Sequence, residues 1–130
     1  MKQIVPIALG GSIGALLRYG VSAITKKIFT SSYPFGTFIV NLVGAYFIGF
    51  FWGMFEKQNV SEQLKSFVLI GLIGSFTTFS TLSYETVKFF QLGDTKAGLL
   101  HILITNLLGL VMVVLGYFSA HKLNIALIKK

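Results

Sequence analysis

Four apolar segments, each about as long as a bilayer is thick, constrain this chain more than any other feature. They cover residues 4–24, 35–55, 67–90 and 97–120. A helix that rises ~1.5 Å per residue crosses ~30 Å of hydrocarbon in about 20 residues. Hydrocarbon offers the backbone no water, and the alternating pattern of a membrane barrel strand is absent. The sequence therefore predicts an all-α membrane protein with four transmembrane helices, forming one domain over residues 1–130.

The composition supports a lipid bilayer as the main surrounding of the chain. The chain has 130 residues, of which 54% are hydrophobic and 12% charged, against roughly 25% charged in soluble domains. The net charge of +7 does not indicate nucleic acid, because no binding motif accompanies it and basic ends of membrane proteins meet headgroups. There are no cysteines, which excludes disulfides and thiolate metal sites and leaves the redox compartment open. Lys2 and the apolar run after it resemble a signal peptide, but Arg18 interrupts the run, so we expect a retained first span.

Basic residues are nearly balanced between the two sides that four spans create. The side with both termini and the second connector holds six lysines: Lys2, Lys57, Lys65, Lys122, Lys129 and Lys130. The other side holds four: Lys26, Lys27, Lys88 and Lys96. Counting charges slightly favours one orientation with both ends in the cytoplasm. The balance is also compatible with insertion in both orientations and pairing of two opposed copies.

The polar groups inside the apolar segments are mainly hydrogen-bond donors. They are Arg18, Asn41, Glu85, His101, Thr105, Asn106 and a hydroxyl run made of Ser75, Thr77, Thr78, Ser80, Thr81 and Ser83. The chain has four acidic residues, and none lies near the centre of a span. Amide, hydroxyl and backbone N–H donors, together with phenylalanine edges, suit an anion better than a cation. No catalytic motif is present, so we expect no enzyme activity.

Glycines next to the hydroxyl run predict a break in the third helix. Gly71 and Gly74 precede the hydroxyls, and hydroxyls can satisfy backbone groups that a break releases. Carbonyls freed in this way bind small cations such as Na⁺. The alternative is that each hydroxyl bonds back to its own helix. Small residues spaced by four, Gly10 with Gly14 and Ala45 with Gly49 and Gly53, indicate close helix contacts within a monomer or a dimer.

Three stretches together resemble the Fluc/CrcB fluoride channels: GGSIGALLRY at 10–19, GTFIVNLVGAYFIGF at 36–50 and GLIGSFTTFSTLSYE at 71–85. The resemblance implies a dual-topology antiparallel homodimer in a bacterial cell membrane, with two fluoride pores at the subunit interface. It implies passive, fluoride-selective export that protects a cell from fluoride accumulated as HF. It also implies a structural Na⁺ at the dimer centre, held by the backbone carbonyls of Gly74 and Thr77.

The resemblance also assigns roles to single residues. It places the fluoride pore at Asn41, Phe79, Ser80, Thr81, Leu82, His101 and Thr105. The Asn41 amide would donate to fluoride, the Phe79 ring edge would face the anion, and Arg18 would be the arginine near the end of the first helix. Each has a structural alternative: Asn41 bridging helices, Phe79 packing, and Arg18 reaching the membrane interface. His101, too, has the alternative of lying at the membrane interface.

The chain departs from the family pattern at three positions. Leu82 stands where the second phenylalanine is usual, and His101 where a tyrosine is usual; Thr105 replaces a serine. A leucine has no quadrupole edge to offer an ion, so a heterodimer in which a paralogue supplies the missing groups remains an alternative. Two further alternatives are a small four-helix drug exporter, which would need a carboxylate deeper in the membrane than Glu85, and a non-transporting scaffold subunit.

Overall fold

The computed structural model describes residues 2–128, with side chains up to residue 124. All regular elements in this part of the chain are helical: α1 (Ile4–Ile28), α2 (Phe35–Glu56), α3 (Glu62–Lys65), the π-helix η1 (Ser66–Ile73), α4 (Gly74–Phe76), α5 (Phe79–Gln91) and α6 (Thr95–Ile128). Four helical stretches are long and apolar enough to cross a membrane: α1, α2, the stretch Glu62–Gln91 and Thr95–Asn124. The predicted all-α architecture with four membrane-spanning helices is confirmed.

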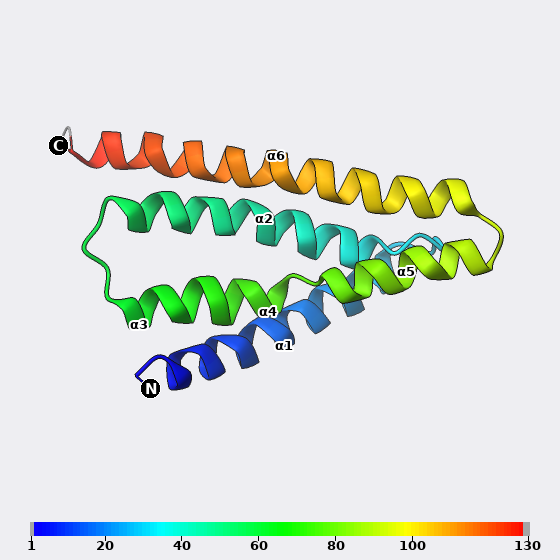
Figure 1. Cartoon of the computed structure of the whole chain (residues 1–130), viewed down its shortest axis with the longest axis horizontal. Helices are drawn as coiled ribbons and strands as arrows, with labels where there is room; N and C mark the ends of the chain where they lie inside the picture. The colour runs from blue at the N-terminus through cyan, green and yellow to red at the C-terminus, as the bar shows by residue number, and fades with distance from the viewer. Residues whose placement is uncertain (1, 129–130) are drawn as a thin grey trace.

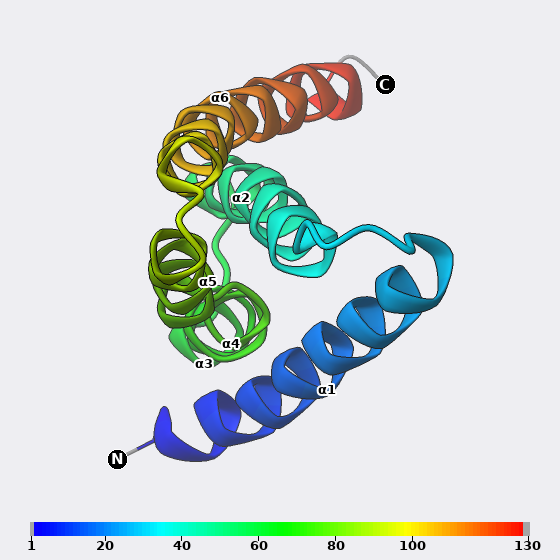
Figure 2. The same cartoon turned by 90° about the vertical axis from the view of Figure 1, so that its right-hand side faces the viewer.

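The four helical stretches run alternately in opposite directions (Figure 1). The start of α1, the end of α6 and the α2–α3 connector lie at one end of the molecule, and the other two connectors lie at the opposite end. Helix α2 occupies the centre, with α6 on one side and α3, α4 and α5 on the other. Figure 2 shows that α1 crosses the outside of this arrangement beneath α3 and α4. The termini and connectors therefore lie at the ends of the molecule where four successive spans would place them.

Glycines allow the helix pairs to approach closely within the single chain. A Cβ atom at Gly49 would overlap the Val113 carbonyl of α6, and one at Gly116 would overlap the Tyr46 carbonyl of α2. In the same way, a Cβ atom at Gly10 would overlap the Phe67 carbonyl of η1. Small side chains are the usual means of close helix contact in lipid, where burial of apolar area gives no driving force. The small-residue faces thus build contacts inside the monomer.

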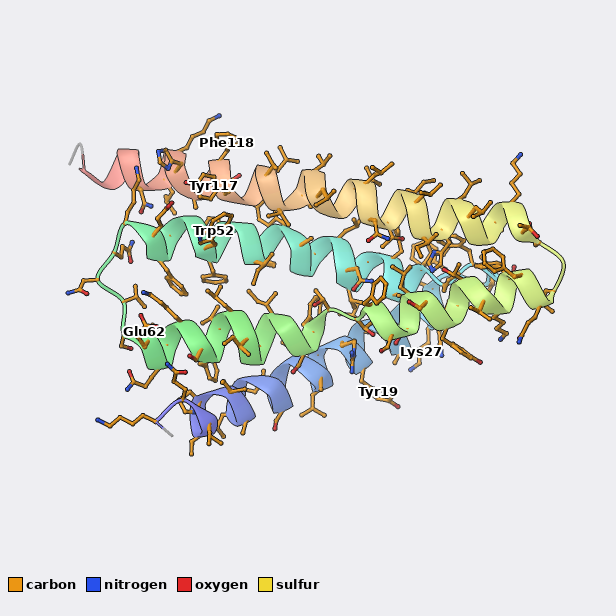
Figure 3. The ribbon with its side chains drawn as sticks, viewed as in Figure 1. Tyr19, Lys27, Trp52, Glu62, Tyr117 and Phe118 are labelled. Atoms are coloured by element: carbon orange, nitrogen blue, oxygen red, sulfur yellow. The ribbon has the colours of Figure 1, made fainter. Side chains whose placement is uncertain are left out.

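Most large apolar side chains outside these contacts remain exposed, as expected for surfaces that face lipid. The buried apolar core is small: Val40, Val68, Ile73, Leu82 and Ala120. Figure 3 shows Tyr19 pointing away from the helices, while Trp52 of α2 lies against Tyr117 of α6. The Trp52 and Tyr117 ring centroids are 5.2 Å apart. An apolar exterior around a small core is what a multi-pass membrane protein requires.

Candidate functional site

The helical geometry of the third span is interrupted at Thr77 and Thr78. Both residues have extended backbone, with ψ of 158° at Thr77 and 114° at Thr78. In a continuous helix the Thr78 N–H would donate to the Gly74 carbonyl, but it donates to Asn41 Oδ1 at 2.8 Å. The Thr81 N–H likewise donates to Thr78 Oγ1 at 3.2 Å instead of to the Thr77 carbonyl. Side chains therefore replace the helical partners of the backbone here.

Asn41 joins the middle of α2 to this interruption through two hydrogen bonds. Its Nδ2 donates to the Thr78 carbonyl at 3.0 Å, and its Oδ1 accepts from the Thr78 N–H at 2.8 Å. The amide thus pairs with one peptide unit as a neighbouring strand would. An amide NH₂ carries two hydrogens, so one donor of Asn41 holds the backbone and the second is left for another acceptor.

The hydroxyl run divides between the two uses that the sequence left open. Thr78 Oγ1 is the centre of a cluster, 3.0 Å from Thr81 Oγ1 and 3.3 Å from Ser80 Oγ. It also caps the N-terminus of α5, the role for which threonine is well suited. Thr77 Oγ1 instead bonds back to the Ile73 carbonyl of its own helix at 3.2 Å. Consecutive hydroxyls in this segment therefore have different structural roles.

A groove of about 400 Å³, here called the inner groove, lies beside the interruption. Its lining includes Asn41, Gly74, Thr77, Phe79, Leu82 and Thr105. Phe79 is 69% exposed in the single chain, whereas Leu82 is 2% exposed and packed. The inner groove combines an amide, hydroxyls and an unpacked phenylalanine ring, which are groups that can replace the water around a small anion.

A larger cavity of about 770 Å³, here called the outer cavity, lies where the α1–α2 connector meets α5. Lys26, Lys88 and Thr81 contribute to its lining, and so do Tyr33 and Glu85. The lining also includes Asp94, so the charges of two lysines and two carboxylates meet in this cavity. Thr81 lines the outer cavity and contacts Thr78 of the inner groove, so α5 connects the two spaces.

Arg18 and Ser80 contact different groups at the interruption. The Arg18 guanidinium makes a long hydrogen bond of 3.5 Å to the Thr77 carbonyl. Arg18 is therefore directed toward the interrupted span. Ser80 is exposed, and its hydroxyl contacts Thr78.

His101 has no exposed surface and lines neither of these spaces. Its ring lies between Tyr33, with centroids 5.2 Å apart, and Phe89, at 5.9 Å. One turn further along α6, the Thr105 hydroxyl donates to the His101 carbonyl at 2.6 Å and also lines the inner groove. His101 is thus packed behind the cavity walls, and Thr105 faces the groove.

A polar network surrounds Glu85, and the sequence did not indicate that its members meet. Glu85 Oε1 accepts from the Thr37 hydroxyl at 2.8 Å, and Oε2 lies 3.3 Å from His101 Nε2. His101 Nδ1 lies 3.0 Å from the Tyr33 hydroxyl. Glu85 and His101 stood out in the sequence as polar groups within apolar segments, and Thr37 stands one turn before Asn41 on the same face of α2. Tyr33 lies in a connector 68 residues from His101, so its participation needs the fold.

The pKa of Tyr33 is raised above its ordinary value of 10.0 by burial and, secondly, by the negative charge of Glu85. Tyr33 therefore keeps its hydroxyl proton at neutral pH. A protonated Tyr33 can donate to His101, which determines the hydrogen-bond pattern available to the network.

Backbone carbonyls are the groups that could hold a cation. Among the described residues, no group of three His, Cys, Asp or Glu side chains is placed to bind a metal ion. The carbonyls of Gly74 and Thr77 have lost their helical donors to Asn41 and Thr78. A carbonyl oxygen has two lone pairs, so the Arg18 contact leaves Thr77 one for a cation. Hard oxygen donors of this kind suit Na⁺.

Together, the four apolar helices and the donor-lined inner groove define a small multi-pass membrane protein with a polar site within its membrane-spanning part. Comparison with known families identifies the particular class. Residues 5–117 match the family described as "CrcB-like protein, Camphor Resistance (CrcB)". The chain belongs to this CrcB family.

Curated relatives match nearly the whole chain. A protein of Desulfotalea psychrophila is 45% identical over 119 residues, covering 92% of each chain. Proteins of Shewanella sp. strain W3-18-1 and Salinibacter ruber are 41% and 44% identical over 116 residues, covering 89% of this chain and 94% and 87% of theirs. All three relatives carry the name "Fluoride-specific ion channel FluC".

Proposed function

We propose that this chain is a fluoride-selective ion channel that lets fluoride leave the cell passively and so lowers cytoplasmic fluoride. The observation that carries the proposal is the inner groove, where the free donor of Asn41, the threonine hydroxyls and the Phe79 ring meet. The shared name of the relatives, fluoride-specific ion channel, supports it. Fluoride is small and strongly hydrated, so several donors must replace its water. A channel of this kind is not an enzyme.

We propose that two copies in opposite orientations form the working channel in a bacterial cell membrane. The inner groove is open along one side of the single chain, and Phe79 is 69% exposed there. A second copy would enclose the groove and bury this ring. The nearly equal distribution of lysines supports insertion in both orientations. Leu82 is 2% exposed, so leucine fills its own place in the monomer and leaves no gap that a paralogue must fill, which favours a homodimer.

Within the pore, we assign contact with fluoride to Asn41 and Phe79, which line the inner groove. Thr105 also lines it, and its hydroxyl would have to turn away from the His101 carbonyl to donate to the ion. Ser80 and Thr81 extend the donor set toward the outer cavity through their contacts with Thr78. Leu82 supports the groove wall by packing, and His101 does so from behind it. Arg18, through its contact with Thr77, is assigned a structural role at the interruption.

Replacing Phe79 with isoleucine tests the pore assignment. We expect fluoride flux to fall about tenfold, the factor that corresponds to losing an interaction of about 1.4 kcal/mol with the ring edge. Growth on fluoride of a bacterial strain without its own fluoride exporter measures the effect. The unsubstituted protein should restore growth and Phe79→Ile should not.

Phe118→Ile is the matched control, because Phe118 is also exposed but lies on α6 away from the inner groove (Figure 3). It should restore growth fully. Equal growth with Phe79→Ile and the unsubstituted protein, at equal membrane abundance, would remove Phe79 from the pore.

We also propose that Na⁺ binds at the dimer centre through the carbonyls of Gly74 and Thr77 of both copies. When bound, the ion would supply a fixed positive charge that holds the two interrupted helices together. A ligand at about 100 times its Kd stabilises the state that binds it by about 2.7 kcal/mol. We therefore expect a larger dimer fraction and a higher Tm in Na⁺ than in N-methylglucamine at equal ionic strength. Indistinguishable dimer fractions and Tm values in the two buffers would contradict the sodium site.

A further inference from the structure

The network of Glu85, His101, Tyr33 and Thr37 carries an inference that rests on the proposed channel function and goes beyond it. Both nitrogens of a completely buried imidazole and both oxygens of one carboxylate have partners. The side chain of Glu85 is 19% exposed, whereas that of His101 is not exposed. Glu85 and Tyr33 both line the outer cavity. The network is therefore buried at its centre and in contact with the cavity at two points.

When His101 is neutral, the partners in the network decide which atoms carry the hydrogens. An ionised Glu85 can only accept, so the hydrogen of His101 is on Nε2 and points to Glu85. Nδ1 is then an acceptor, and the Tyr33 hydroxyl, which burial and Glu85 keep protonated, donates a hydrogen bond to it. Both nitrogens of His101 and both oxygens of Glu85 are then paired, and the network carries one negative charge.

One added proton changes both the charge and the direction of a hydrogen bond. The Tyr33 hydroxyl can pass its proton to His101 Nδ1 and take the added proton from hydronium in the outer cavity, which leaves water. His101 then donates from both nitrogens, Tyr33 accepts, and the network has no net charge. A proton on Glu85 instead of His101 gives the same net charge, so the electrostatic result does not depend on which group holds it.

The charge of this network acts on the anion path from close by. Glu85 lines the outer cavity, and the His101 backbone carbonyl accepts the hydroxyl of Thr105, which lines the inner groove. A negative charge at this place repels fluoride, and cavity walls of low dielectric strengthen the repulsion. With the network neutral, the two lysines Lys26 and Lys88 outnumber the one remaining carboxylate, Asp94, in the cavity lining.

The other ionisable groups that face the network come from each neighbouring element. They line the outer cavity together with Glu85 and Tyr33, and are Lys26 of α1, Tyr84 and Lys88 of α5, and Asp94 of the α5–α6 connector. Imidazole is the side chain whose ordinary titration falls between about pH 5 and 8. His101 is the imidazole of this network.

We propose that His101, Glu85 and Tyr33 form a proton-binding site in the wall of the fluoride path, so that fluoride conductance rises as pH falls from 8 to 5.5. Loss of one repelling charge from a focusing cavity is expected to raise the flux roughly tenfold, the lower end of the range for electrostatic focusing. The site would increase fluoride exit under acid conditions, when HF brings fluoride into a cell.

The test is fluoride release from liposomes that contain the purified protein, at equal pH on both sides, after addition of a K⁺ ionophore. Protein-free liposomes at each pH measure the leak of HF. His101→Asn should give a flux that is flat between pH 6 and 8. Glu85→Gln should give, at pH 8, the high flux that the unsubstituted protein reaches at pH 5.5. His121→Asn, which removes the other histidine of the chain, should keep the unsubstituted pH profile.

The outcomes separate this inference from the channel proposal. A fluoride flux that changes less than about twofold over the same range would overturn the proton site and leave the channel intact. A pH profile of His101→Asn equal to that of the unsubstituted protein would also overturn it. No fluoride release at any pH from folded protein would overturn the channel proposal and the inference together.

Discussion

Replacing Asn41 with aspartate is expected to reduce fluoride flux at least about a hundredfold. The substitution removes both N–H donors of the amide, one that holds the Thr78 carbonyl at 3.0 Å and one that is free for the ion. It also places a carboxylate against that carbonyl and beside an anion path. Losing a buried hydrogen-bond partner costs about 1–3 kcal/mol, and more where a charge is involved. Initial rates of fluoride release from liposomes give the measurement.

Asn59→Asp supplies the matched control, because Asn59 is exposed in the α2–α3 connector. It adds the same charge outside the spans and should leave flux within about twofold. The size-exclusion profile of each variant separates lost conduction from lost assembly. Normal flux through Asn41→Asp would show that the Asn41 amide neither holds the interruption nor contacts the ion.

Replacing Gly49 with valine is expected to prevent α2 and α6 from packing. A Cβ atom at Gly49 would overlap the backbone carbonyl of Val113, and a backbone group cannot rotate away as a side chain can. Overpacking usually costs about 1–3 kcal/mol, and contact with backbone lies at or above that range. We expect aggregated or degraded protein and no fluoride resistance in cells. Membrane abundance and elution as a single species provide the measurement.

Gly20→Val serves as the control for this prediction. A Cβ atom at Gly20 meets no atom within 4 Å, so the same side chain on another membrane helix should be tolerated. Both substitutions carry the same penalty for a β-branched residue in a helix. If the two variants were equally abundant and equally monodisperse, close packing of α2 on α6 would not be needed for stability.

The membrane-spanning helices could be predicted from sequence because segment length and apolar content are local properties. Lipid requires every backbone group to be paired within the segment, so a long apolar run has few alternatives to a helix. The ends were less well predicted: α1 continues to Ile28 and α6 to Ile128, past the apolar segments. Lysine and asparagine at these ends are polar without being helix breakers, so hydropathy gives no signal for where the helix stops.

The candidate site could be predicted only in part, because its contacts join residues distant in sequence. The hydroxyl run drew attention to residues 75–83, but only the fold shows that Thr78 caps α5 and Thr77 bonds to its own helix. Asn41 was singled out as a lone amide in an apolar helix. The partners of His101 come from α5 and a connector, so its position behind the cavity walls was not readable from its place on α6.

Ion release from liposomes that contain only this protein tests the central claim most directly. Vesicles loaded with potassium fluoride and potassium chloride receive a K⁺ ionophore, and electrodes follow both anions. A self-sufficient fluoride channel predicts rapid fluoride release while chloride is retained. Release of both anions would contradict selectivity. Retention of both by folded, dimeric protein would contradict a homodimeric channel, and fluoride release restored by a co-expressed paralogue would then establish the heterodimer.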